Sequence, residues 1–224
     1  ASSELADLAL AEFVAVRPDA PVVTRHLAQD PIPSDAWQTA VGASWTPEAD
    51  RSEAQNSAVA LAATIAGELR DADVAVLALP LYNWGVSQNS KTWIDLAIAG
   101  SEQGERLLDG KPVVLITTRG GSYAPGTPKE GWDHNVEYLR RILVDVWGAD
   151  LTLVEWMLRW KRDLPRRMFE YHALATLAAF AHAESAQREA HAQGLTDRTR
   201  APRIDSTVVL LSGRETPWPA VRSL

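Results

Sequence analysis

The residues with the clearest capacity for chemistry lie in a short loop, "PLYNWG", that follows an apolar stretch. Pro80 blocks continuation of the preceding strand, and Gly85 permits a tight return of the chain. Between them, the Asn83 side chain and nearby backbone amides can face a planar heterocycle that has several hydrogen-bond acceptors, and Tyr82 and Trp84 offer flat surfaces. The competing interpretation is an ordinary capped turn whose aromatic residues pack on a neighbour.

A second loop, "TTRGGSY", has the same logic. Gly120 and Gly121 allow the backbone to approach a ligand closely, and Arg119 can offset negative charge on that ligand. A single Gly-Gly pair after a strand usually marks only a turn. Two such loops, each following an apolar stretch, favour one shared ligand site.

Alternating strands and helices position these loops. The strands at residues 72–79 and 111–118 are apolar at consecutive positions, as expected where helices cover both faces of a sheet. Further strands are predicted at residues 22–27, 149–156 and 206–212, and helices at about residues 2–14, 53–69, 87–99, 135–147 and 163–193. This order predicts a doubly wound parallel α/β sheet, in which ligands bind beyond the carboxyl ends of the strands.

Composition restricts the classes of function. The 224 residues carry a formal net charge of -7, which gives no basic footprint for nucleic acid. No apolar run approaches the ~20 residues that span a bilayer, and nothing at the start resembles a signal peptide. Because the chain has no cysteine, disulfides, thiolate metal sites and a cysteine nucleophile are excluded. We therefore expect a cytoplasmic protein that has no metal and no nucleic-acid or membrane partner.

The two loops and the helix between them resemble the flavodoxin-like FMN-dependent NADH-azoreductases and NAD(P)H:quinone oxidoreductases. The family pattern is a Pro-Met-Tyr-Asn-Phe loop, a helix with Leu-Lys-x-Trp/Tyr-Ile/Phe-Asp, and a Ser/Thr-Arg-Gly-Gly loop. The counterparts here are "PLYNW", "KTWID" and "TRGG". The resemblance covers roughly residues 1–155. It implies a flavodoxin-like, doubly wound parallel five-stranded sheet with helices on both faces.

The resemblance also implies an activity. FMN would take hydride from NADH or NADPH and pass it to a quinone, azo or nitro aromatic compound in a ping-pong cycle. Family members are commonly homodimers, and we expect the same here. The first loop would hold the isoalloxazine edge and the second loop the other side of the ring. The implied cofactor-binding residues are Pro80, Leu81, Tyr82, Asn83, Trp84, Thr118, Arg119, Gly120 and Gly121.

The phosphate loop is where the sequence departs from the family order. Family members begin with a strand and a Ser-rich loop ahead of the first helix, whose free amides and dipole favour phosphate. Here the sequence opens in that helix, while a strand and loop close it. We therefore expect a circular permutation in which residues 206–224 supply the central first strand, and Ser212, Ser2 and Ser3 face the phosphate. A truncated protein with an unrelated carboxyl-terminal strand is the alternative.

This interpretation predicts one flavodoxin-like domain over residues 1–224. Its parts are a core at 1–155, a long helical segment at 156–193, a linker at 194–205, and the permuted strand with its phosphate loop at 206–224.

Tyr123 and His134 are the candidate catalytic residues, because related quinone reductases use a Tyr and a His in this loop. His134 would protonate a reduced substrate. A solvated loop histidine is the alternative for His134, since the hydride steps need no side-chain acid or base.

The rival class of function is a non-redox protein on the same fold, because fold does not determine function. It would be a flavodoxin-like binding module, or a specialised biosynthetic protein whose pocket holds another flat ligand. The closing loop "SGRETPWPAVRSL", with its two prolines, favours this alternative.

Overall fold

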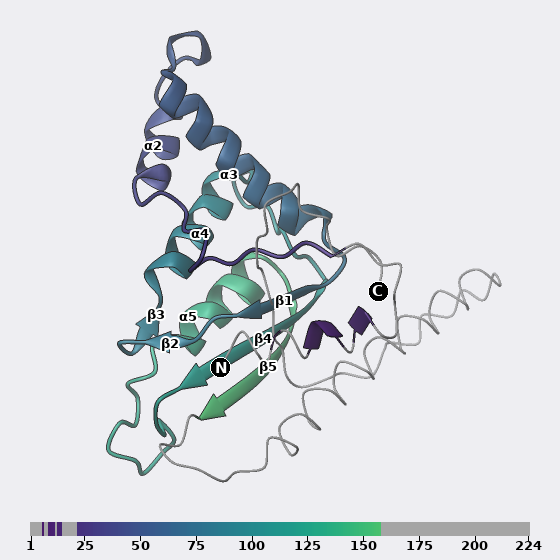
Figure 1. Cartoon of the computed structure of the whole chain (residues 1–224), viewed down its shortest axis with the longest axis vertical. Coiled ribbons are helices and arrows are strands. Elements are labelled where there is room, and N and C mark those ends of the chain that lie inside the picture. Colours follow the sequence, from purple (N-terminus) through teal and green to yellow (C-terminus); the bar gives the residue numbers. More distant parts are fainter. Residues whose placement is uncertain (1–5, 7–8, 12, 15–21, 158–224) are drawn as a thin grey trace, which may run out of the picture.

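The computed structural model describes residues 6, 9–11, 13–14 and 22–157, which are arranged around a parallel sheet (Figure 1). In the described residues this sheet has the strand order β1 (Ala75–Ala78), β4 (Pro112–Arg119), β5 (Asp150–Met157). Leu115 of β4 lies beside Leu77 of β1 and beside Leu153 of β5. The strands predicted at residues 72–79, 111–118 and 149–156 are confirmed.

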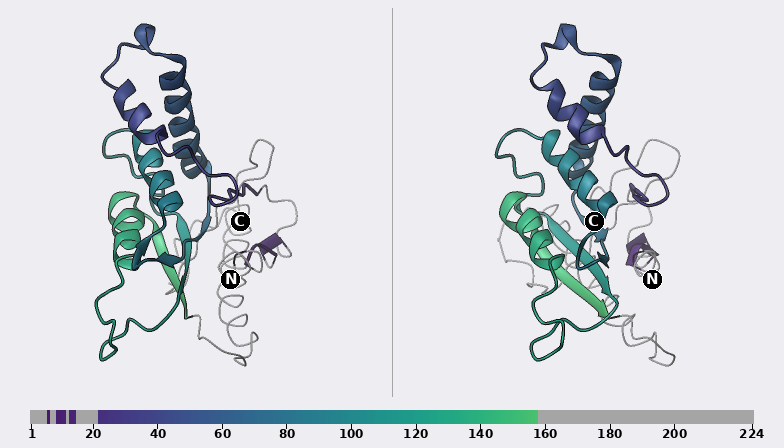
Figure 2. Two further views of the ribbon diagram at one scale, coloured as in Figure 1. Left: turned by 60° about the vertical axis from the view of Figure 1, so that its left-hand side comes forward. Right: turned by 90° about the vertical axis from the view of Figure 1, so that its left-hand side faces the viewer.

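Helices cover both faces of the sheet. Those with defined bounds are α2 (Ala36–Ala43), α3 (Glu53–Asp71), α4 (Gln88–Ala99) and α5 (Val136–Arg140), with a 3-10 turn, η1 (Glu48–Asp50), before α3 and a π-helical turn, η2 (Arg141–Val146), after α5. Figure 2 shows α5 on one side of the strands and the helical residues near the amino terminus on the other.

Alternate side chains of β4 point into the two helical layers. Val113 and Leu115 are buried in the larger core, together with side chains of α2, α3, α4 and α5. Val114 and Ile116 instead pack against Ala6 on the opposite face. A strand buried on both faces must be apolar at consecutive positions, which is the pattern that identified β4 in the sequence.

Serine side chains begin two of the long helices. The Ser52 Oγ accepts the amide of Gln55 at 3.2 Å, and the Gln55 side chain accepts the Ser52 amide at 2.9 Å, which makes a capping box for α3. The Ser87 Oγ accepts the amide of Ser90 at 3.2 Å and begins α4. The helices predicted at residues 53–69 and 87–99 are therefore confirmed, and the one predicted at 135–147 is divided between α5 and η2.

The strand predicted at residues 22–27 is wrong. Residues 22–26 belong to no sheet of the described structure, and residues 27–29 form a turn. A strand needs a neighbour for its backbone groups, and the predicted neighbour, residues 206–212, lies outside the described residues. An ion pair of 2.7 Å between Arg25 and Glu68 instead fixes this segment to α3, with both side chains almost fully buried.

The remaining domain predictions are tested only at one point. Strand β5 extends to Met157, so the helical segment predicted from residue 156 does not begin there. The rest of that segment, the linker and the permuted strand lie outside the described residues and stay predictions. In the part of the chain that the structure describes, no helix is both long enough and apolar enough to cross a membrane.

Candidate ligand site at the carboxyl edge of the sheet

The first predicted ligand loop folds as a β-hairpin beyond the carboxyl end of β1. Strand β2 (Leu81–Tyr82) pairs antiparallel with β3 (Gly85–Val86). Asn83 and Trp84 form the two-residue turn, with φ of 47° and 64°. Positive φ at both central residues is the mark of a type I′ turn. The expectation that Gly85 makes the tight return is wrong, because Gly85 lies in β3 and the turn is made by Asn83 and Trp84.

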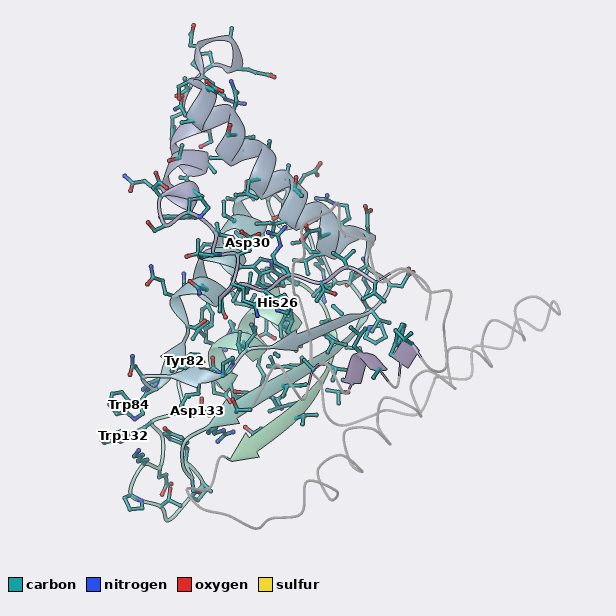
Figure 3. All side chains as sticks on the ribbon, viewed as in Figure 1. His26, Asp30, Tyr82, Trp84, Trp132 and Asp133 are labelled. Atoms are coloured by element: carbon teal, nitrogen blue, oxygen red, sulfur yellow. The ribbon has the colours of Figure 1, made fainter. Side chains whose placement is uncertain are left out.

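Large aromatic side chains gather at the tip of this hairpin. Tyr82, Trp84 and Trp132 are 58%, 44% and 49% exposed. The rings of Trp84 and Trp132 meet edge to face, with centroids 5.8 Å apart. Figure 3 shows the three residues at one outer edge of the molecule, while Asp133 lies further in. We call Tyr82, Trp84 and Trp132 the aromatic edge. Exposed aromatic side chains grouped in this way commonly mark a binding surface.

The second predicted loop begins where β4 ends. Thr118 is buried, and the next two residues after Arg119, Gly120 and Gly121, have open space beside them. A Cβ atom built at either glycine meets no heavy atom within 4 Å. The loop therefore leaves room for a ligand directly beyond the strand end.

Residues near the start of α5 join the two loops. The His134 amide donates to the Trp84 carbonyl oxygen at 2.9 Å, across the hairpin turn. The buried Asn135 side chain donates to the Leu79 carbonyl oxygen at 3.3 Å and to the Thr117 hydroxyl at 3.0 Å. The ends of β1 and β4, the hairpin and the loop before α5 thus form one hydrogen-bonded platform.

The Arg119 side chain is engaged by protein groups at this edge. Its Nε lies 3.3 Å from an Asp133 carboxylate oxygen, and its Nη2 forms an ion pair with Glu155. Its Cζ lies 5.9 Å from the centre of the Tyr123 ring, which also has the Lys129 ammonium 5.8 Å from its centre. The expected contact of Arg119 with a ligand charge stays a prediction, and the guanidinium already faces two carboxylates.

The candidate catalytic residues lie in different surroundings. Tyr123 is half-buried between Arg119 and Lys129, whereas the His134 side chain is exposed. In the described part of the chain, no hydrogen bond or ring contact joins Tyr123 to His134, so the structure does not pair them. The phosphate-loop candidates Ser2, Ser3 and Ser212 lie outside the described residues.

The third family motif, "KTWID", supports the helix rather than the site. Trp93 is fully buried and meets Trp147 edge to face at 5.8 Å. Lys91 and Asp95 form an ion pair of 2.6 Å along the surface of α4. The motif therefore stabilises the element between the two loops.

Sequence reasoning missed Trp132, Asp133, Asn135 and Glu155 as residues of this region. Trp132 could have been found from the sequence, since a tryptophan in a polar loop is not expected to be buried in the core and is therefore a candidate surface contact. Asp133 could also have been found, because an Asp shortly before a helical pattern is a capping residue. The partners of Arg119 could not be found locally, because Asp133 and Glu155 are distant from it in the sequence.

Comparison with known proteins places these observations in a family. A family model described as a flavodoxin-like fold matches residues 1–154. An FMN-dependent NADH:quinone oxidoreductase of Frankia alni is 37% identical over 68% of this chain and 74% of its own length. Another protein of the same name, from a Parafrankia species, is 34% identical over 82% of this chain and 84% of its own.

Solved structures agree on the fold. A crystal structure of the azoreductase AzrA superposes with a TM-score of 0.60 at 22% identity, covering 80% of this chain and 90% of that one. An FMN-dependent NADH-azoreductase from Bacillus anthracis in complex with FMN gives a TM-score of 0.58 at 15% identity, covering 81% and 90%. With its parallel sheet, its helices on both faces and these relatives, the chain belongs to the flavodoxin-like fold family that includes the FMN-dependent NADH:quinone oxidoreductases.

Proposed function

We propose that this chain is an FMN-dependent oxidoreductase that takes hydride from NADH and reduces quinones and azo compounds. The observation that carries the proposal is the 2.9 Å hydrogen bond from the His134 amide to the Trp84 carbonyl oxygen. It joins the hairpin of the first family loop to the loop before α5, at the carboxyl edge of a parallel sheet, which is where this class of fold binds its ligands. The reaction in this proposal is taken from the names of the relatives, which are FMN-dependent NADH:quinone oxidoreductases and azoreductases.

The residues at this edge fit a flavin ring. Gly120 and Gly121 leave open space where any larger residue would project a Cβ. The hairpin turn holds Asn83 in the left-handed region, at the exposed tip of the hairpin. In this proposal Pro80 to Trp84 hold one side of the ring, and Thr118 to Gly121 hold the other.

The bound FMN supplies the hydride chemistry, and the chain supplies position and surroundings. The aromatic edge offers a flat, exposed surface on which a planar acceptor stacks. The edge-to-face contact of Trp84 with Trp132 holds those rings in place. No side-chain acid or base has to act in the hydride steps, so Tyr123 and His134 serve at most to donate a proton to reduced product.

A homodimer in the cytoplasm is part of the proposal. Trp37 and Trp45, in and just after α2, are 45% and 87% exposed, which supports an assembly that covers apolar surface. Sedimentation equilibrium of the purified chain tests it, and a monomer at micromolar concentration would contradict it. NADPH as an alternative donor is tested by comparing the two nicotinamides at equal concentration.

The first test of function is the visible absorption spectrum after excess FMN is added and unbound FMN is removed. We expect a retained two-banded flavin spectrum that NADH bleaches and an added quinone restores. A protein that stays colourless would overturn the reductase proposal and favour a non-redox protein that binds another flat ligand.

A matched pair of variants locates the cofactor. Gly121→Ala places a methyl group in the proposed ring site, whereas Gly42→Ala places one in equally open space on α2. We expect Gly121→Ala to weaken FMN binding about tenfold to a hundredfold, since a misplacement of about 1 Å at a preorganised site can have an effect as large as about a hundredfold. Gly42→Ala should bind FMN like the unmodified chain. Equal FMN binding by both variants would place the cofactor elsewhere.

A further inference from the structure

The Arg119 guanidinium is already paired with carboxylates of the protein, which does not favour a role in binding an anionic ligand. The side chain is only 14% exposed, and its guanidinium faces the carboxylates of both Asp133 and Glu155. One positive charge therefore meets two negative charges before any ligand arrives. The nearby Lys129 ammonium lies 5.8 Å from the centre of the Tyr123 ring and is exposed to solvent.

Asp133 uses its two carboxylate oxygens for two different elements. One oxygen accepts the backbone amides of Asn135 and Val136 at 2.9 and 3.0 Å, at the start of α5. The other oxygen lies 3.3 Å from the Arg119 Nε, at the end of β4. Arg119 and Asp133 are thus the two stems of the loop formed by residues 120–132, and their contact closes its base.

The loop between these stems has its own internal hydrogen bonds. The Gly126 amide donates to the Glu130 carboxylate at 2.8 Å, and the Thr127 hydroxyl donates to the Ala124 carbonyl oxygen at 2.8 Å. Gly120 and Gly121 connect this hydrogen-bonded segment directly to Arg119. Whatever fixes the stems therefore also fixes Gly120 and Gly121.

We propose that Arg119 is a positioning residue, which holds the base of the 120–132 loop closed through Asp133 and Glu155 and thereby sets the place of Gly120 and Gly121. It does not act as the counter-charge of the cofactor. The part of this proposal that concerns FMN rests on the proposed function, whereas the closure of the loop stands without it.

Neutralising the carboxylates of Asp133 and Glu155 distinguishes a positioning role of Arg119 from a counter-charge role, because the two roles predict opposite changes in FMN affinity. If Arg119 closes the loop, Asp133→Asn and Glu155→Gln loosen it and weaken FMN binding, as Arg119→Met does. If Arg119 is a counter-charge, the same two variants release the guanidinium toward the anionic cofactor and strengthen binding. Asp133→Asn keeps an oxygen for the amides of Asn135 and Val136, so the start of α5 is preserved.

The experiment measures the FMN dissociation constant of the full chain by flavin fluorescence, and amide hydrogen exchange over residues 122–134 in the FMN-free protein. We expect Arg119→Met to raise the dissociation constant about tenfold to a hundredfold and to speed exchange in this loop. Asp133→Asn should act in the same direction, and Glu155→Gln more weakly, because its side chain is 43% exposed. Tightened FMN binding in either carboxylate variant would overturn the proposal.

Two further variants serve as controls. One retains the charge at position 119, and the other removes an ion pair outside the site. Arg119→Lys keeps the charge but loses the planar fork that reaches both carboxylates, so we expect it to loosen the loop as well. Full FMN affinity in Arg119→Lys would overturn the proposal. Arg141→Gln removes an exposed ion pair with Asp145 outside the site and should change neither readout.

Riboflavin, which lacks the phosphate, is the second probe. Because the loop faces the ring in the proposed site, Arg119→Met should weaken riboflavin and FMN by the same factor. A loss confined to FMN would assign Arg119 to the phosphate and overturn the proposal.

If the unmodified chain binds neither flavin but Arg119→Met still speeds amide exchange in the loop, the proposed function fails and the closure of the loop is confirmed. Unchanged exchange in Arg119→Met overturns the closure regardless of flavin binding.

Discussion

Replacing Trp84 by glycine tests two roles of this residue separately: its effect on the free energy of unfolding and its effect on the KM for a quinone. Trp84 occupies the second position of a two-residue turn with φ of 64°, where glycine is the favoured residue. Left-handed backbone costs a residue with a Cβ atom roughly 1–2 kcal/mol, which Trp84→Gly recovers. The carbonyl oxygen that accepts the His134 amide is main chain, so the variant retains that hydrogen bond.

The opposing losses are larger, because Trp84 is only 44% exposed and the variant loses the burial of about half of the indole, roughly 2–3 kcal/mol. Trp84→Gly removes the edge-to-face contact with Trp132, worth about 0.5–1.5 kcal/mol beyond area burial. Glycine also adds about 0.4–1 kcal/mol of unfolded-state entropy. Together these losses exceed the recovered backbone cost, so Trp84→Gly should lower the free energy of unfolding by about 1–4 kcal/mol. A buried tryptophan such as Trp93 should instead lose about 3–5 kcal/mol when it is cut to alanine.

Function should respond differently from stability. We expect the KM for a naphthoquinone to rise about threefold to tenfold in Trp84→Gly, which corresponds to one lost aromatic contact. Urea unfolding measures the stability, and steady-state kinetics at saturating NADH measures the acceptor. A loss above about 4 kcal/mol, as for a fully buried tryptophan, would show that Trp84 is a packing residue. An unchanged quinone KM would refute stacking on the aromatic edge.

Three further predictions concern the scaffold. Gly100→Ala should destabilise the chain by about 3 kcal/mol, because a Cβ there would lie 2.0 Å from the Ala62 carbonyl oxygen; thermal unfolding measures this. The Arg70 hydrogen bond lowers the pKa of Glu105 to about 2 from 4.5, so its stabilisation is complete above pH 4.5 and is lost as the pH falls toward 2. At this surface site it should be at most about 1 kcal/mol and fall with salt in urea titrations. Val209→Asp should abolish cooperative unfolding if residues 206–212 supply a central strand covered on both faces.

Each of these has a matched control. Gly67→Ala adds a methyl group to open space on α3, so it should raise the melting temperature slightly, and destabilisation there would refute the steric argument for Gly100. Glu105→Gln should remove the pH dependence below 4.5 that is assigned to this carboxyl. Ala220→Asp lies beyond the predicted strand and should be tolerated. If Val209→Asp is tolerated equally well, the predicted permutation is wrong.

The elements that the sequence predicted correctly are those whose signals are local. Strand β4 is apolar at four consecutive buried positions, Val113 to Ile116, because helices cover both of its faces, and this pattern can be recognised without the structure. Helix α3 begins at Ser52 with Gln55 three residues later, a pattern that needs only neighbouring residues to form its capping box.

The errors occur where distant residues decide the structure. The β-branched residues of the 22–26 segment have strand propensity, yet the described residues give them no strand neighbour, and the Arg25–Glu68 pair attaches them to α3 instead. Asn83 and Trp84 adopt positive φ because β2 and β3 pair, which turn propensity alone does not predict for a tryptophan. The partners of Arg119 come from the loop before α5 and from β5, so its charge looked free in the sequence.

The main-chain hydrogen bond between His134 and Trp84 has an evolutionary consequence. Because neither side chain takes part in it, mutation can exchange either residue without releasing the hairpin from the loop before α5. Related chains can then diversify in the compounds they accept by drifting at Trp84, while the platform beneath is inherited unchanged. Under the proposed function, the surface offered to an acceptor can therefore change without rebuilding the sheet edge that carries it.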